Sequence, residues 1–158
     1  MFESFTESAI HVLMTAQKQA RKLGHDRLGT REILIALSKE PSGLVGHIME
    51  SAGFSIDRCL VEIQSGRSIN SDATSGRRGL KLACIMDLFT PMPFSSDSLR
   101  LMHAAIALSH KANSKNVLPE HILLALSELH DCRGAQLLSK SGVQIHTLRN
   151  KILAMSAS

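Results

Sequence analysis

Residues 5–56 read FTESAIHVLMTAQKQARKLGHDRLGTREILIALSKEPSGLVGHIMESAGFSI, and residues 94–145 read FSSDSLRLMHAAIALSHKANSKNVLPEHILLALSELHDCRGAQLLSKSGVQI. The two stretches align without a gap at a constant offset of 89 residues, so that Phe5 matches Phe94 and Gly53 matches Gly142. A register held over so many positions is not expected by chance. The sequence therefore indicates one unit that is present twice.

Apolar residues in both units recur at spacings of three and four, which is the period of an α-helix. In the first unit, Thr6 is expected to cap a first helix that Gly24 ends, and Thr30 to cap a second one. In the second unit, Ser95 or Ser96 takes the capping position, and Pro119 stands at the start of the second helix, where proline is tolerated. The stripes of the two first helices are Ile10, Leu13, Ala16, Ala20 and Leu23, and Leu99, Met102, Ala105, Ile106 and Ala112.

Further stripes predict a third and a fourth helix in each unit, with Gly53 and Gly142 just after the third. Alternating strand patterns are scarce. We therefore expect an all-α fold, a pseudo-two-fold bundle of eight helices built from two four-helix units. The first unit is placed at residues 1–64 and the second at 93–155, and together they form one domain.

A linker at residues 65–92 separates the units, and its two halves differ in composition. The first half is polar, whereas the second half gathers seven apolar residues between positions 80 and 89. Two interpretations stay open for this apolar segment: it docks back on the two units, or it is an exposed hydrophobic site for a partner.

Composition limits the class of protein. Hydrophobic residues make up 44% of the 158 residues and aromatic residues only 3%, which predicts an aliphatic core. No apolar run approaches the roughly 20 residues that span a bilayer, and the first residues do not resemble a signal peptide. The three cysteines, Cys59, Cys84 and Cys132, form no C-x-x-C pair, which favours free thiols in a reducing compartment. The net charge of +4 is scattered, so we expect neither nucleic-acid nor membrane binding.

Both units carry short motifs in a fixed order. The first unit has Met1-Phe2, Phe5-Thr6-Glu7, Leu23-Gly24-His25 and Gly29-Thr30-Arg31-Glu32-Ile33-Leu34, and the second has Pro93-Phe94 and Pro119-Glu120-His121-Ile122-Leu123. In combination these motifs resemble the N-terminal domain of the Clp unfoldases, most closely the ClpC type. The resemblance covers both units, which is most of the chain outside the linker.

The resemblance implies a docking platform that recruits adaptors or substrates to an ATP-driven unfoldase and its protease. The chain has no G-x-x-x-x-G-K-[ST] loop, so we expect no ATPase of its own. The implied partners are Clp ATPase or protease subunits, adaptor proteins or substrate proteins, and the chain itself is expected to be a monomer without a cofactor or metal. It is either the N-terminal piece of a larger unfoldase or a free-standing relative, in the cytoplasm or in a plastid stroma.

An alternative within the same resemblance is an anti-adaptor, which mimics the unfoldase domain and competes for its adaptors. An enzyme is disfavoured, because no H-E-x-x-H, metal-ligand or G-x-S-x-G pattern accompanies the eight histidines. Competition against adaptor binding would separate a recruiting from an inhibiting role.

Five residues match partner-facing positions of the family: Phe2, Thr30, Arg31, Phe94 and Glu120. The resemblance implies that a glutamate in Gly-Thr-Glu-His pairs with phosphoarginine, whose phosphate is held by the threonine and the helix start. Arg31 takes the place of that glutamate, and Glu120 is preceded by Pro119, which offers no hydroxyl and no N–H. We therefore expect phosphoarginine binding to be weak or lost. The alternative is that the two phenylalanines pack inward and that the three polar residues cap helices or face solvent.

Overall fold

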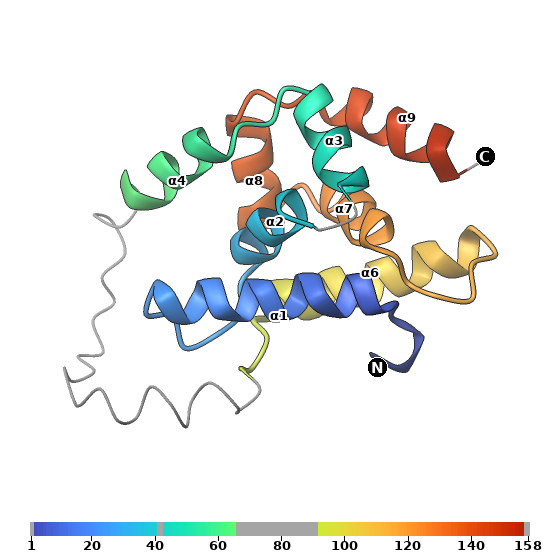
Figure 1. Ribbon diagram of the computed structural model, residues 1–158, viewed down its shortest axis with the longest axis horizontal. Coiled ribbons are helices and arrows are strands. Elements are labelled where there is room, and N and C mark those ends of the chain that lie inside the picture. The colour runs from blue at the N-terminus through green and yellow to red at the C-terminus, as the bar shows by residue number, and fades with distance from the viewer. Residues whose placement is uncertain (1, 41–42, 66–91, 157–158) are drawn as a thin grey trace.

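The computed structural model describes residues 2–40, 43–65 and 92–156, and eight α-helices account for most of this part of the chain (Figure 1). The first unit contains the 3-10 helix η1 (Phe2–Ser4), α1 (Glu7–Lys22), α2 (Thr30–Ser38), α3 (Leu44–Ser51) and α4 (Ile56–Ser65). The second unit contains α6 (Ser96–Lys111), α7 (Pro119–Glu128), α8 (Arg133–Lys140) and α9 (Ile145–Ser156).

All four helices of the second unit begin 89 residues after their counterparts in the first. The all-α fold of two repeated four-helix units is therefore confirmed. The unit and linker boundaries stay a prediction, and the apolar segment at residues 80–89 lies outside the described residues.

The two units also share the chemistry that starts and ends their first helices. The Thr6 Oγ1 atom accepts a hydrogen bond from the Ala9 amide at 3.3 Å, and Ser95 Oγ accepts one from the Ser98 amide at 3.2 Å. After each helix the backbone enters the left-handed region, at Gly24 (φ 74°) and at the matched Asn113 (φ 54°). Asparagine tolerates this conformation better than most residues, so the turn survives the change of residue.

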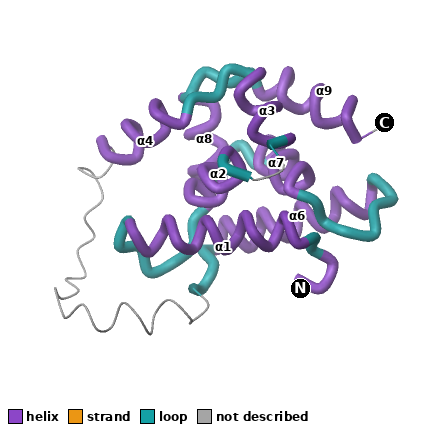
Figure 2. The backbone as a smooth tube through the Cα atoms, viewed as in Figure 1, coloured by secondary structure: helices purple, strands orange, loops and turns teal. Residues whose placement is uncertain are grey.

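The helices form layers around a central pair (Figures 1 and 2). Helices α2 and α7 are buried along nearly their whole length, as expected for helices that are surrounded by protein. Helix α1 packs on α2 and α6 packs on α7, on one side of this pair. Helices α3, α4, α8 and α9 lie on the other side and cross between the units, so that α8 packs on α2 and α9 contacts α3.

Two short backbone contacts, related by the internal repeat, join the two units. Phe5 forms a parallel bridge with Val117, and Leu28 forms one with Phe94, which are the same two positions with the units swapped. The Val117 amide donates to the Ser4 carbonyl at 2.7 Å, and the Leu28 amide donates to the Pro93 carbonyl at 2.9 Å. The buried apolar residues of both units also belong to one shared core.

The buried stripe of the two long helices differs from the predicted one. Ile10 and the matched Leu99, both members of the predicted stripes, are 39% and 38% exposed. The buried residues of α1 are Ala9, Val12, Leu13, Ala16 and Ala20. Spacings of three and four describe two overlapping stripes here, one from Ala9 and one from Ile10, so periodicity alone could not choose between them.

Thr30 does not cap α2, contrary to the sequence prediction. Gly29 is the N-cap residue and Thr30 is the first residue of the helix. The Thr30 Oγ1 atom instead accepts a hydrogen bond from the Gly134 amide of α8, at 2.9 Å. A contact across 104 residues of sequence outweighs the local preference of threonine for the cap.

Candidate functional site

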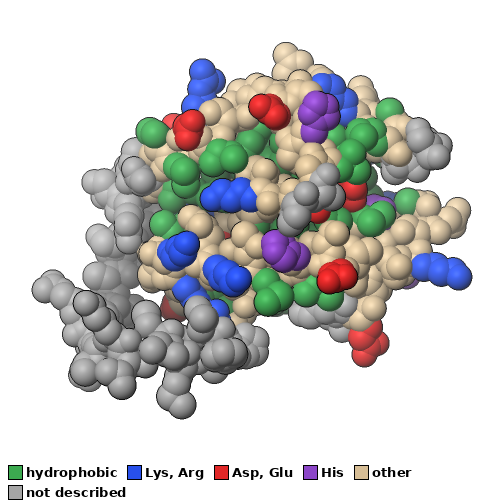
Figure 3. All heavy atoms as spheres, viewed as in Figure 1, with side chains coloured by type: hydrophobic (Ala, Val, Ile, Leu, Met, Phe, Trp, Pro, Cys, Tyr) green, Lys and Arg blue, Asp and Glu red, His purple; other side chains and the backbone are tan. Residues whose placement is uncertain are grey.

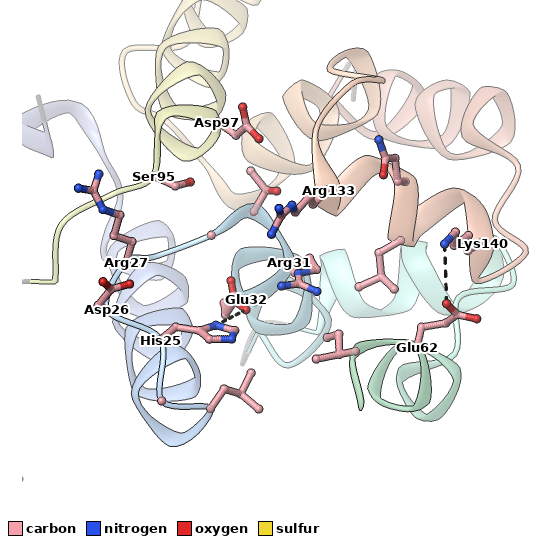
Figure 4. A pocket seen from close by; sticks show the side chains of 17 residues that line it. His25, Asp26, Arg27, Arg31, Glu32, Glu62, Ser95, Asp97, Arg133 and Lys140 are labelled. Carbon is pink, nitrogen blue, oxygen red and sulfur yellow. Dashed lines mark ion pairs between the residues drawn. The ribbon is translucent and has the colours of Figure 1, made fainter. Parts of the chain in front are cut away.

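A cavity of about 710 Å³ opens where four segments of the chain meet (Figure 4). Its wall is formed by the turn after α1, the first turn of α2, the end of α4 and one face of α8, with the start of α6 at its edge. The lining is rich in charged side chains of both signs. On the face seen in Figure 3, lysine and arginine side chains gather over the region of α1 and α2.

The starts of α2 and α8 converge beside this cavity. The Thr30–Gly134 hydrogen bond ties them together, and a Cβ atom added at Gly134 would lie 2.7 Å from the Thr30 carbonyl oxygen. Glycine is therefore required for this approach. Because the N-terminal end of a helix carries a partial positive charge, two such ends face the same space.

Two arginines stand at these helix starts. Arg31 is the second residue of α2 and Arg133 is the first residue of α8, and both line the cavity. In Figure 4 both guanidinium groups lie between the His25–Glu32 pair and the Lys140–Glu62 pair. Within residues 2–40, 43–65 and 92–156, neither arginine has an ion pair or a side-chain hydrogen bond. The two guanidinium groups are therefore available to bind an anion, although the lining as a whole contains charges of both signs.

Glu32 forms part of the cavity wall although only 1% of the residue is exposed. Its Oε1 atom lies 3.1 Å from His25 Nδ1, but that oxygen has no hydrogen-bond partner among the described residues. A Cβ atom at Gly29 would lie 2.5 Å from Glu32 Oε2, so the carboxylate folds back over the helix start. His25 is therefore the nearest nitrogen donor to this oxygen, which is itself buried away from the open space of the cavity.

Two other acidic residues of the wall, Glu62 and Asp97, form ion pairs with basic side chains, whereas Asp26 forms none within the described residues. Glu62 lies 3.9 Å from Lys140, and Asp97 lies 3.6 Å from Arg100 on its own helix. Asp26 and Arg27, both exposed, lie next to each other in the turn after α1. None of these acidic groups forms an ion pair with Arg31 or Arg133.

The five predicted site residues fall in different places. Thr30 and Arg31 line the cavity, whereas Phe94 and Glu120 do not. Phe94 is half-buried against the core at its bridge with Leu28, and Phe2 lies in η1, where only its backbone is described. The structure therefore groups two of the five, and the partner-binding role of all five stays a prediction.

Glu120 occupies the start of α7, at the position that matches Arg31. Burial raises the pKa of this carboxyl, and the nearby Glu40 carboxylate raises it further. Next to it, burial lowers the pKa of His121, whose Nδ1 atom accepts a hydrogen bond from the Leu118 amide at 3.1 Å. The second unit thus has an acidic helix start where the first has a basic one.

Arg133 and Glu32 were not among the predicted site residues. The repeat itself contains the pattern that could have found Arg133, because its match in the first unit is the apolar Leu44. Likewise, Glu32 replaces the histidine that the second unit has at His121. Charged residues that differ between the two units are therefore the sequence feature that could have identified these two site residues.

The described residues contain neither a metal-binding cluster nor a membrane-spanning helix. Across residues 2–40, 43–65 and 92–156, no group of three or more His, Cys, Asp or Glu side chains is gathered for a metal ion. In the same residues, no helix combines the length and apolar character needed to cross a membrane.

Comparison with known sequences gives consistent matches. The family model described as Clp repeat (R) N-terminal domain matches residues 4–78 and 93–158. A ClpA homolog, an ATP-binding subunit of the ATP-dependent Clp protease from Cyanidium caldarium, is 31% identical over 98% of this chain. The chloroplastic chaperone protein ClpC1 of Oryza sativa subsp. japonica is 28% identical over the same share. This chain spans only 16% and 15% of the lengths of these two relatives.

Solved structures agree with the sequence matches. The N-terminal domain of ClpD, a caseinolytic protease associated chaperone from Arabidopsis thaliana, superposes with a TM-score of 0.74 and 28% identity, covering 100% of this chain and 97% of its own. The Hsp104 N-terminal domain of Candida albicans gives a TM-score of 0.68 over 97% of this chain and 91% of its own, and at 16% identity it supports the fold alone.

Proposed function

This chain belongs to the Clp repeat N-terminal domain family, and from that premise we propose that it is a protein-docking module of a Clp unfoldase and protease system. The observation that carries the proposal is the match of both units in sequence, together with whole-chain similarity to the ClpD N-terminal domain. The module would recruit adaptors or substrates without catalysing a reaction, since the sequence has no phosphate-binding loop for ATP.

The partners follow from the same premise. We propose that the chain binds Clp ATPase or protease subunits, adaptors or substrates, and that it is a monomer by itself. Several relatives from land plants are named chloroplastic, which supports a plastid stroma rather than the cytoplasm that we first expected. The native protein can therefore be sought in a stromal extract as well as in a whole-cell extract.

A second candidate is an anti-adaptor that competes with the unfoldase domain for its adaptors. The specific observation in its favour is the altered helix start, where Arg31 stands unpaired in the cavity and Pro119 precedes Glu120. A protein with a family fold and an altered ligand surface could occupy adaptors without passing substrates on. Adding the purified chain to a Clp degradation assay would raise the degradation rate for a recruiter and lower it for an anti-adaptor.

Weak or absent phosphoarginine binding is part of this proposal. An arginine at position 31 repels the guanidinium of phosphoarginine, and Glu120 lies outside the cavity that Arg31 lines. Calorimetric titration with free phosphoarginine should give little heat, and tight binding would overturn this point.

The experiment that tests the docking function is capture of the untagged native protein from its own source, with intact mass and partners read together. Recovery with a Clp ATPase, protease subunit or adaptor supports the proposal. The intact mass then separates a free-standing protein of about 17.2 kDa from the docking domain of a larger unfoldase. Recovery without any Clp partner would leave the fold unaffected and refute the function.

A further inference from the structure

We propose that the cavity between α2 and α8 binds a carboxylate-bearing peptide segment of a partner protein. This inference rests on the proposed docking function and adds the chemistry of the segment that is docked. Its basis is the pair Arg31 and Arg133, the size of the cavity and the difference between this cavity and the matched region at the starts of α7 and α3.

The two guanidinium groups favour an oxyanion. Arg31 and Arg133 project from helix starts that the Thr30–Gly134 bond holds together, so both can reach one group in the cavity. A carboxylate accepts paired hydrogen bonds from guanidinium groups, and the two helix ends add to the attraction. Without an anion, the two positive charges repel one another at a site where no described carboxylate pairs with either.

The size of the cavity favours a peptide segment over a simple anion. Its volume of about 710 Å³ is large enough for several residues, of which one carboxylate side chain would contact the two arginines. Glu32 is only 1% exposed and its Oε1 atom lies 3.1 Å from His25 Nδ1, so this carboxylate faces the histidine rather than the arginines.

The matched region of the fold, at the starts of α7 and α3, predicts the direction of selectivity. Glu120 stands where Arg31 would be, and the apolar Leu44 stands where Arg133 would be. An acidic segment is therefore repelled by the start of α7 and attracted by the start of α2. The chain should bind one acidic segment, on one side of the pseudo-two-fold axis.

Fluorescence anisotropy with the full chain tests the inference, using a fluorescein-labelled peptide of alternating aspartate and glycine. Peptides with asparagine or lysine in place of aspartate are the matched controls. We expect the aspartate peptide to bind best, and to bind more weakly as salt rises from roughly 0.05 to 0.5 M. Arg31→Gln and Arg133→Gln should each weaken binding about ten-fold, because each removes a charged hydrogen bond.

The double variant Lys18→Gln/Lys115→Gln is the control for net charge. Both lysines are exposed and lie outside the cavity, so this protein should bind like the unmodified one. Equal weakening by this variant and by Arg31→Gln/Arg133→Gln would overturn the inference, as would equal binding of the asparagine peptide. Competition by inorganic phosphate at lower concentrations than the aspartate peptide would assign the site to phosphate instead, and would also overturn it.

Failure of this inference can be told from failure of the docking function. If native Clp partners are still recovered by the Arg31→Gln/Arg133→Gln protein at unchanged yield, the domain docks through another surface and only the inference fails. If the unmodified protein recovers no Clp partner, the docking function itself fails.

Discussion

The starts of the two central helices, α2 and α7, occupy equivalent positions and have opposite chemistry. Helix α2 begins with Thr30 and Arg31 and is tied to α8, whereas α7 begins with Pro119 and Glu120 and is stabilised by the side chain of His121. Helix lengths, caps and cross-unit bridges are nearly the same in both units. The two units therefore share their arrangement of helices but differ in the polar residues at the starts of α2 and α7.

The two central helices also differ in how they pack against the other unit, α2 against α8 and α7 against α3. Helix α2 packs closely on α8 because Gly134 admits the Thr30 backbone, whereas the matched pair, α7 and α3, has Val45 and Pro119 at these positions and packs less extensively. The start of α2 therefore forms a tight junction with α8 beside the cavity. A site that needs fixed geometry is better supported there than at the start of α7.

The largest effect is expected at the glycine of this junction. Gly134→Val introduces at α8 the residue found at Val45, and its Cβ atom would meet the Thr30 carbonyl oxygen and carbon, at 2.7 and 2.9 Å. We expect a loss of about 3 kcal/mol in the free energy of unfolding, measured by urea denaturation. Ser139→Val, at an exposed position of the same helix, should cost less than about 0.5 kcal/mol. Equal costs for the two variants would mean that the close approach of α2 and α8 is not needed.

Reversal of charge at the two matched helix starts is the next test. Arg31→Glu places in the first unit the charge found in the second, and it should weaken binding of the aspartate peptide about 100-fold. Glu120→Gln, at the matched position, should leave that affinity within about two-fold, because Glu120 lies outside the cavity. The anisotropy titration measures both. A larger effect at Glu120 would place the peptide on the other unit.

Acid should affect the start of α7 through His121. Burial lowers the pKa of this histidine, so the unfolded chain binds more protons as the pH falls below its ordinary value of 6.5, and stability is lost. Protonated Nδ1 also cannot accept the Leu118 amide, at a cost of about 1 kcal/mol. His121→Gln, which keeps an acceptor, should lose less stability between about pH 7.5 and pH 5 by denaturant titration. An unchanged pH dependence would contradict this role.

Glu120 contributes to the pH dependence of stability with the opposite sign. Its pKa is raised in the folded protein, so its contribution favours the folded state at low pH and is lost as the pH rises through the raised value. The effect of His121 is therefore best measured in a Glu120→Gln background, where this opposing contribution is absent.

The smallest effects are expected at the matched lysine contacts between units. Lys151 Nζ donates to the Ser51 carbonyl and to Ser51 Oγ, both at 2.9 Å, at the C-terminal end of α3. Lys140 and Glu62, at the swapped positions, form only an exposed pair at 3.9 Å. Lys151→Met should cost about 1 kcal/mol and Lys140→Met less than about 0.5 kcal/mol in thermal unfolding. The reverse order would show that the ion pair is the stronger link.

The sequence predicted the framework well because the framework is what the repeat conserves between its halves. The constant offset predicted that each helix of the first unit recurs in the second, and glycines at 24, 53 and 142 marked three helix ends correctly. The prediction of buried positions was wrong at Ile10 and Leu99, because two stripes were equally periodic. The prediction of a cap at Thr30 was wrong because its hydroxyl accepts a hydrogen bond from the distant Gly134 amide.

The candidate site was predicted only in part. Arg31 was found because it departs from a family motif in a recognisable place. Arg133 and Glu32 were missed, because their places in the cavity wall depend on α8 lying against α2 and on the burial of Glu32 beside His25. Packing between elements far apart in one sequence cannot be derived from local periodicity.

Hydrogen–deuterium exchange on the chain in complex with its captured native partner tests the central claim most directly. If the cavity between α2 and α8 is the docking site, amides at residues 23–34 and 133–140 should exchange more slowly in the complex, while those at residues 112–124 are unchanged. Slower exchange around the start of α7, or equally around both helix starts, would contradict the account.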